Sequence, residues 1–436
     1  MKTYDVVGVG FGPSNLSLAI ALDEHPAGMT AAFFERQSSF GWHRNMLLPS
    51  ATMQISFLKD LATFRNPTSP FSFVSFLHEH GRLPRFVNNQ DFFPTRQEFH
   101  QYLEWAETRV SHQVSYRSEV TSMRLPQGTG AATHVKIAIR DTSRGDIRWV
   151  GARNVVVSTG LVPRMPHGVI ADQRVWHSSE FLGKFQAMNP AELRTVAVVG
   201  AGQSAAEITR FMHDALPHAQ VYSIMPSYGY SVADDTPFAN QVFDPAAVDD
   251  YYYGSDQARE AFWRYHRNTN YSVVDDEVIR DLFRRTYDEE VRDHRRLHFL
   301  NLTRVTEVKR VGDETRVLLD SMAGVTSELD VDAIVFASGY DSMDPTRLLG
   351  DLNRFCLTDE HGRLRVERDY RVATTSDLGC GIYLQGGTEH THGLSSALLS
   401  NIAVRSGEIV ESIMRRKAGF EDGFAGAFEE VRRDAA

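Results

Sequence analysis

The chain has 436 residues, which is room for two or three domains at about 150 residues each, so a small disulfide-stabilised module is excluded. Its 46 Lys and Arg stand against 56 Asp and Glu, a formal charge of −10, and this acidity argues against nucleic acid as the main partner. Hydrophobic residues make up 42% of the chain, yet no run approaches the roughly 18 apolar residues of a membrane helix. We therefore expect a soluble globular protein without a membrane segment.

The cysteine content points to a reducing compartment. Cys356 and Cys380 are the two cysteines of the chain; they are widely separated and lack the paired spacing of a zinc site or disulfide framework. The N-terminal sequence reaches Gly8 before an apolar stretch as long as that of a signal peptide can develop. These features predict a cytoplasmic protein with no metal site.

Three short β-branched runs that end at glycine, residues 4–8, 195–200 and 332–339, are typical of buried parallel strands. A helical apolar pattern follows each of the first two, and a second strand comes next, at 31–35 and at 220–225. The repeat predicts an α/β fold with two Rossmann-like β-α-β units.

The first unit carries a glycine fingerprint, Gly8, Gly10 and Gly12, with Pro13 in the first helical turn, where proline is tolerated. Glycines there allow a tight turn and let backbone amides approach a pyrophosphate at the helix N-terminus. Glu35 closes the second strand, where a carboxylate binds a ribose hydroxyl. This pattern suits FAD or NAD.

The second unit repeats the arrangement with Gly200, Gly202, Gln203 and Ser204. A single unit would leave a dehydrogenase or a simple nucleotide binder open, but two units favour a flavoprotein reduced by a nicotinamide nucleotide. Glu207, inside the following helix, is expected to be a solvated residue on the helix face.

Four segments are more specific than the glycines: residues 53–76, which contain FLKDL, DDTPFAN at 234–240, NTNYSVVD at 268–275, and THGLSSALLS at 391–400. They resemble, in the right order over almost the whole chain, the flavin-dependent N-hydroxylating monooxygenases, and among these the L-ornithine N-hydroxylases of siderophore and related peptide biosynthesis. In this family NADPH reduces FAD, molecular oxygen adds to the flavin to give a C4a-hydroperoxide, and the side-chain amine of ornithine attacks its distal oxygen. The resemblance therefore implies FAD, NADPH, oxygen and L-ornithine as partners, and a tetramer.

With this resemblance, we divide the chain into a discontinuous FAD-binding domain, 1–165 and 331–436, and an NADPH-binding domain, 166–330, with a substrate-binding insertion at 227–300. Lys59 would pair with the substrate carboxylate, and Asn240 and Asn270 would contact the substrate backbone. Asn270 would also hold the nicotinamide ribose, and Gln54 would contact the flavin and steady the peroxide, so these two are the expected catalytic residues. The remaining expected contacts are Ser400 at the substrate, and Trp42, His43, Val120, Tyr271, Ser272, Ala397, Leu398 and Leu399 at the cofactors.

Several alternatives stay open. The substrate can be L-lysine or a diamine such as putrescine, because one methylene changes pocket affinity by only about 1–3 kcal/mol. Pro226 stands where many relatives have an arginine for the 2′-phosphate, so NADH competes with NADPH unless Ser204 or a nearby basic residue replaces that contact. A disulfide reductase would need a redox cysteine pair, which Cys356 and Cys380 do not form, and an FAD-binding sensor would lack turnover. His390 and His392 resemble metal ligands, but we interpret them as loop residues.

Overall fold

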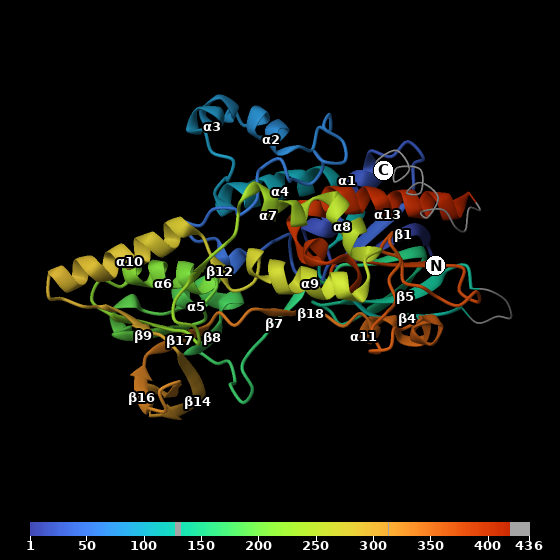
Figure 1. Cartoon of the computed structure of the whole chain (residues 1–436). Coiled ribbons are helices and arrows are strands. Elements are labelled where there is room, and N and C mark those ends of the chain that lie inside the picture. The colour runs from blue at the N-terminus through green and yellow to red at the C-terminus, as the bar shows by residue number, and fades with distance from the viewer. Residues whose placement is uncertain (127–131, 313, 419–436) are drawn as a thin grey trace.

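The computed structural model describes residues 1–126, 132–312 and 314–418. Two sheets form its two lobes, seen at the right and left of Figure 1. The first sheet has the order β3-β2-β1-β6-β5-β4, with β19 pairing parallel to the last residues of β6. Its strands are β1 (Thr3–Val9), β2 (Ala31–Phe34), β3 (Val114–Ser115), β4 (Ser118–Arg124), β5 (Val135–Asp141), β6 (Ile147–Val157) and β19 (Gly381–Leu384).

The second half of strand β1, residues 6–9, is apolar and buried because both faces of the first sheet are covered there. Val6 packs into a cluster with the helices on one face, and Val7 packs into a second cluster on the other. The helices on the first face include α1 and α13, and Ser17 of α1 donates a hydrogen bond to the carbonyl of Ile402 at 3.3 Å. The C-terminal helix thus packs back on the first layer. The helices of this lobe are α1 (Pro13–Asp23), α2 (Phe73–Glu79), α3 (Leu83–Asn89), α4 (Arg96–Val110), α11 (Thr346–Leu349), α12 (Glu389–His392) and α13 (Ile402–Lys417), with short 3₁₀ turns η1 (Arg44–Met46), η2 (Ser111–Gln113), η7 (Gly350–Phe355), η8 (Leu394–Ala397) and η9 (Leu399–Asn401).

The second sheet is parallel throughout, in the order β13-β10-β9-β17-β8. Helices α5, α6 and α10 pack on one face, and the antiparallel sheet β14-β15-β16 covers the other. The elements are β8 (Val175–His177), α5 (Phe181–Ala187), β9 (Thr195–Val199), α6 (Gln203–Ala215), β10 (Gln220–Ile224), α10 (Asp276–Val291), β13 (Leu297–Leu300), β14 (Thr303–Val311), β15 (Glu314–Ser321), β16 (Thr326–Val331) and β17 (Ala333–Phe336), with 3₁₀ turns η3 (Ser178–Glu180) and η4 (Pro190–Glu192).

Strand β17 corrects one expected boundary. We placed residues from 331 onward in the FAD-binding domain, but β17 lies between β9 and β8 of the second sheet, with Ile334 opposite Ala197. The chain returns to the first lobe only after it, where β18 (Tyr340–Ser342) pairs antiparallel with the outgoing β7 (Leu161–Pro163). Residues 419–436 of the expected FAD unit lie outside the described residues.

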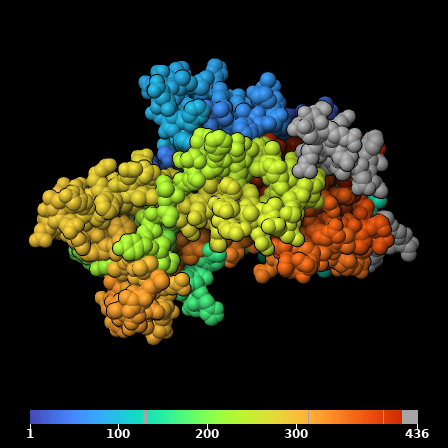
Figure 2. All heavy atoms as spheres, in the orientation of Figure 1, coloured from blue at the N-terminus to red at the C-terminus, as the bar shows by residue number. Residues whose placement is uncertain are grey.

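The insertion covers fewer residues than the expected range 227–300. Its last two elements belong to the second lobe, because α10 packs on α6 and β13 pairs with β10. The part up to residue 275 crosses the front of the molecule between the lobes, yellow-green in Figure 2. It contains β11 (Ser231–Val232), α7 (Pro237–Asn240), η5 (Gln241–Phe243), α8 (Pro245–Tyr252), α9 (Asp256–His266), η6 (Arg267–Thr269) and β12 (Val273–Val274). Arg368, 5% exposed, anchors it to the first lobe by pairing with Asp249 of α8 and Glu408 of α13.

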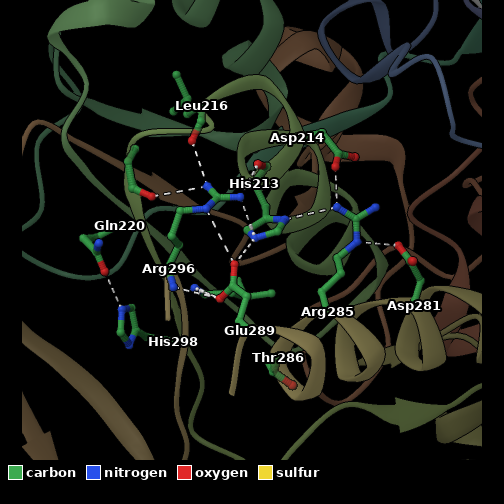
Figure 3. Close-up of polar contacts among 12 residues, drawn as sticks. His213, Asp214, Leu216, Gln220, Asp281, Arg285, Thr286, Glu289, Arg296 and His298 are labelled. Atoms are coloured by element: carbon green, nitrogen blue, oxygen red, sulfur yellow. Dashed lines mark hydrogen bonds and ion pairs between the residues drawn. The ribbon is translucent and has the colours of Figure 1, made fainter. Parts of the chain in front are cut away.

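A polar cluster attaches α10 to the second sheet (Figure 3). Glu289 of α10 accepts hydrogen bonds from the backbone N–H groups of Arg296 and Leu297, each at 2.8 Å, and its other oxygen lies 2.7 Å from His213 Nε2. Arg285 donates to His213 Nδ1 at 3.1 Å. Arg296 Nη2 lies 2.9 Å from His213 Nε2, so guanidinium groups face both ring nitrogens of this histidine and Glu289 accompanies them. No helix in the described ranges is long and apolar enough to cross a bilayer.

Candidate active site between the two glycine turns

The first glycine turn leaves room for a ligand. Gly10 has φ +81°, and a Cβ on it would lie 2.4 Å from the carbonyl oxygen of Ser158, so this position requires glycine. A Cβ on Gly12 would meet nothing within 4 Å. Gly12 is the N-cap of α1, which has no side-chain cap, and Pro13 follows it as the first helical residue. Open space beside uncapped N–H groups fits a pyrophosphate.

Polar groups around this turn also fit FAD. The Glu35 carboxylate accepts hydrogen bonds from the backbone N–H groups of Phe11 at 2.7 Å and Gln37 at 2.8 Å, which fixes it beside the glycines, where a ribose hydroxyl is expected. At the other end, Ser400 and Asn401 are each 3% exposed, and the Ser400 Oγ and both amide atoms of Asn401 have no hydrogen-bond partner in the described residues. Because buried polar atoms are nearly always bonded, these atoms are suited to contact a ligand.

The other expected FAD residues occupy the same lobe. Trp42 packs edge-on against His43 at 4.8 Å between ring centroids. Val120 lies buried in β4, beside a register shift in its pairing with β5. Leu398 and Leu399 are half-buried in the segment before Ser400; the side chain of Ala397 lies outside the described residues.

The second glycine turn contacts the insertion. Gly200 has φ +147°, and a Cβ on it would lie 2.6 Å from the carbonyl oxygen of Ala337. Gly202 is the N-cap of α6, also without a side-chain cap. The nearest atom to a Cβ on Gly202 would be Ser272 Cα, at 3.7 Å. The NTNYSVVD segment therefore lies directly against the turn, and Ser272 meets it with a left-handed backbone, φ 60°.

A hydrogen-bonded chain connects this turn with Gln54. The Asp275 carboxylate accepts from Gln54 Nε2 at 3.0 Å and from Gln203 Nε2 at 2.8 Å. Gln203 also donates to Glu207, at 2.9 Å. Glu207 is 2% exposed and forms a two-pronged ion pair with Arg96. The expectation that Glu207 faces solvent is therefore wrong, because Arg96 of the first lobe pairs with it on this side of α6.

Lys59 faces the insertion from the first lobe. Partial burial lowers the pKa of its ammonium, and the nearby Asp244 carboxylate opposes that effect. Asp244 is the N-cap of α8, shortly after Asn240, so Lys59 is near the segment that carries this asparagine. The Asn240 side chain donates to the carbonyl of Asp235 at 2.7 Å, which holds the amide in place at the end of α7.

A phenol and a carboxylate that the sequence patterns did not connect meet beside Asn270. The Tyr271 hydroxyl donates to Glu389 of α12. Burial raises the pKa of Glu389. Nothing in the sequence singled out Glu389, because its partner is far away in the chain and becomes a neighbour only when the insertion folds back.

Comparison with known proteins decides the family. The model for L-lysine 6-monooxygenase/L-ornithine 5-monooxygenase matches residues 2–342. The chain belongs to this family. An ornithine N-hydroxylase of Kutzneria sp. 744, whose structure holds reduced FAD, NADP⁺ and L-ornithine, is 65% identical with a TM-score of 0.93, and the match covers 95% of this chain and all of that one. L-ornithine N(5)-monooxygenases of Burkholderia cepacia and Pseudomonas aeruginosa are 39% and 36% identical, over 89% and 94% of this chain and 90% and 93% of those proteins.

Membership of this monooxygenase family confirms the resemblance inferred from the four segments and the fold of two Rossmann-type units. The two histidines of TEHTHG, residues 388–393, have structural partners. His390 Nε2 is 2.9 Å from the Leu364 carbonyl and His392 Nε2 is 3.2 Å from the Arg368 carbonyl. Burial lowers the pKa of His392 to about 3, so this ring is neutral. In the described parts of the chain, no group of His, Cys, Asp and Glu residues could hold a metal ion.

Proposed function

We propose that this protein is an FAD- and NADPH-dependent monooxygenase that converts L-ornithine to N5-hydroxy-L-ornithine, as an early step toward siderophores or related peptides. The observation that carries the proposal is the contact of the NTNYSVVD segment with the second glycine turn, at a point hydrogen-bonded to the first lobe. A substrate segment between two dinucleotide sites suits a reaction in which both cofactors act on one amine.

The cofactors supply the redox chemistry: reduced FAD activates molecular oxygen for transfer to an amine. The chain itself must bind, orient and exclude water. We assign FAD to the turn at Gly8, Gly10 and Gly12, with Glu35 on the ribose. We assign NADPH to the turn at Gly200 and Gly202.

For the substrate, we assign the α-carboxylate to Lys59, whose half-buried ammonium attracts an anion more strongly than a solvated one would. Asn240, Asn270 and Ser400 would orient the amino-acid backbone and the reacting amine, because amides and hydroxyls both donate and accept. Gln54 and Asn270 remain the proposed catalytic residues, the latter also holding the nicotinamide ribose.

The direct test is to measure bound flavin, NADPH oxidation and hydroxylamine formation with ornithine, lysine and putrescine. The proposal predicts hydroxylated product with ornithine and much less with the other amines. Product from lysine or putrescine above that from ornithine would move the substrate assignment, and NADPH oxidation without any hydroxylated product would overturn the function. The same assay with NADH tests the nucleotide, since Pro226 stands where an arginine would grip the 2′-phosphate; NADPH should give the higher catalytic efficiency.

We also propose a cytoplasmic homo-oligomer, a tetramer by family likeness. Cys356 and Cys380 are both free thiols, in keeping with a reducing compartment. Helix α10 exposes Phe283, Tyr287 and Val291, one turn apart from each other along the helix, and a second copy of the chain could cover this stripe. Light scattering coupled to gel filtration tests this: a monomer would contradict it, and Phe283→Lys should weaken assembly if the stripe is the contact.

A further inference from the structure

Asp275 stands at a helix N-terminus but does not cap the helix. It is the N-cap of α10, where a carboxylate ordinarily accepts from an N–H of its own first turn. Thr95 does so for α4, accepting from Glu98, and Ser255 does so for α9, accepting from Ala258. The Asp275 side chain makes no such bond. Its two oxygens are instead each bonded to a glutamine amide from another part of the chain.

The two amides come from opposite lobes. Gln203 is the first residue of α6, next to Gly202 of the nucleotide turn. Gln54 belongs to the first lobe. The hydrogen-bonded chain then continues from Gln203 through Glu207 to Arg96, which returns it to the first lobe. Asp275 therefore connects Gln54 of the first lobe with the nucleotide turn of the second.

The carboxylate also determines which way each amide points. An ionised carboxylate only accepts, so both glutamines must present their NH₂ groups to it. Two further hydrogen bonds hold the Gln203 amide. It also donates to Glu207, and its Oε1 accepts from the backbone N–H of Asp275 at 2.9 Å. For Gln54, in the described residues, the bond to Asp275 is the one hydrogen bond of its side chain. Its Oε1 is thereby left to accept from a donor elsewhere, and a reduced flavin carries N–H donors.

We propose that Asp275 is a positioning residue that fixes the amide of Gln54, so that its carbonyl oxygen accepts from the reduced flavin, and ties this amide to the nucleotide turn at Gln203. The proposal rests on the proposed function in so far as it requires bound FAD.

Asp275→Asn tests it with a small change of shape. Asparagine can accept from only one of the two amides, and its own NH₂ would face the NH₂ of the other. Since Gln203 is held by two further bonds, Gln54 is the amide that must turn over and present NH₂ to the flavin. The matched control is Asp276→Asn, which removes the same charge from the next residue, whose carboxylate is exposed and pairs with Arg280 within α10.

The main readout is the midpoint potential of the bound flavin, which needs no turnover. Loss of an acceptor that stabilises the reduced ring should make the potential more negative in Asp275→Asn and in Gln54→Leu, and leave it unchanged in Asp276→Asn. The double variant with both changes should match Gln54→Leu alone, because Asp275 acts through Gln54. The ratio of hydroxyornithine formed to NADPH consumed should fall about three- to tenfold in the same variants, the factor expected for one hydrogen bond.

Asp275→Ser provides a second test if the asparagine variant folds poorly. Serine can cap α10 in the ordinary way, and its single oxygen, once it accepts the N–H of the cap, cannot also hold both glutamine amides. Potentials in both Asp275 variants equal to wild type, or effects of Asp275→Asn and Gln54→Leu that simply add, would overturn the proposal. These outcomes are distinct from failure of the proposed function, which would show as absence of bound flavin or of hydroxylated product in the wild-type enzyme.

Discussion

Arg96 and Glu207 form a two-pronged ion pair across the two lobes, with Nη1–Oε2 and Nη2–Oε1 distances of 2.9 Å. Their side chains are 12% and 2% exposed. Arg96 begins α4 and also donates to the carbonyl of Met46, while Glu207 lies in the second turn of α6. The pair therefore holds the helix of the second glycine turn against the lobe that carries the first.

Arg96→Met should destabilise the protein strongly, because it leaves the Glu207 carboxylate buried without its partner. The expected loss is about 3–5 kcal/mol of unfolding free energy, measured by urea denaturation. Glu79→Gln is the matched control, since Glu79 pairs with Arg109 at the surface and exposed pairs contribute about 0–1 kcal/mol. A loss in Arg96→Met no larger than in the control would show that the pair does not hold the lobes together.

The two β-α-β units could be predicted from sequence because their signals are local. A β-branched run, a glycine turn and a helical apolar pattern lie next to one another in the chain, and β1, α1, β9 and α6 occupy the expected places. The sequence did not predict which sheet β17 joins, because a short apolar strand ending in glycine suits either one. Its position between β9 and β8 depends on the topology of the whole lobe.

The polar connections of the site could not be predicted, because they join residues that are distant in sequence. Glu207 on a helix surface looks solvated until Arg96, distant in sequence, is placed over it. Asp275 before a helical stretch predicts a local cap, whereas its partners are Gln54 and Gln203. Arg96–Glu207 and Gln54–Asp275 require the two lobes to be in contact, and Gln203–Asp275 requires α10 to pack on α6. A local pattern carries no information about either.

Lys59→Met should raise the KM for ornithine about 10- to 100-fold, as expected for loss of a charged hydrogen bond to the substrate carboxylate. Flavin content and the rate of flavin reduction by NADPH should stay near wild type, because the proposed role of Lys59 concerns the substrate alone. Steady-state kinetics and the flavin absorbance spectrum check this. Lys309→Met, in the exposed strand β14, is the matched control and should leave the KM unchanged. Loss of flavin in Lys59→Met would instead make Lys59 structural.

The pH dependence of that KM should respond to Asp244. Burial lowers the pKa of Lys59, and the Asp244 carboxylate opposes the shift. Asp244→Asn should therefore lower this pKa further, so that Lys59 loses its charge, and ornithine its partner, at a lower pH than in wild type. Titration of ornithine itself is the same for both enzymes, so the difference between their KM–pH profiles reports on Lys59. The control is Asp250→Asn, which removes an exposed carboxylate from the same helix. An equal shift of its KM–pH profile would show that any loss of negative charge nearby has this effect.

Ser400→Ala should separate binding from stability. The Ser400 hydroxyl is buried without a hydrogen-bond partner in the described residues, so its removal should leave the melting temperature of substrate-free enzyme unchanged or slightly higher. The KM for ornithine should rise about three- to tenfold through loss of one hydrogen bond. Ser412→Ala, equally buried in α13, is the control: its hydroxyl bonds to Asp369 and Tyr383, so it should lower the melting temperature and spare the KM.

Glu289→Gln should destabilise the second lobe in a pH-dependent way. Burial raises the pKa of Glu289, but hydrogen bonds from His213 and from the backbone N–H groups of Arg296 and Leu297 outweigh it, so the net shift is downward. A carboxylate with a lowered pKa in the folded state stabilises the protein above the pKa of the unfolded chain, about 4.3 for glutamate, and this stabilisation is lost as the pH falls through the folded-state value. Near pH 7 the variant should lose about 2 kcal/mol of unfolding free energy, typical of hydrogen bonds to a charged group.

The difference between wild type and Glu289→Gln should shrink below pH 4.3 and vanish once Glu289 is protonated in the folded protein, because both side chains are then neutral. Urea titrations at a series of pH values measure it. Glu290→Gln, whose exposed carboxylate lies 3.7 Å from Arg295, is the control and should show little change at any pH. If the loss of unfolding free energy in Glu289→Gln stays constant down to the lowest pH, the loss comes from the altered shape of the side chain and its charge plays no part.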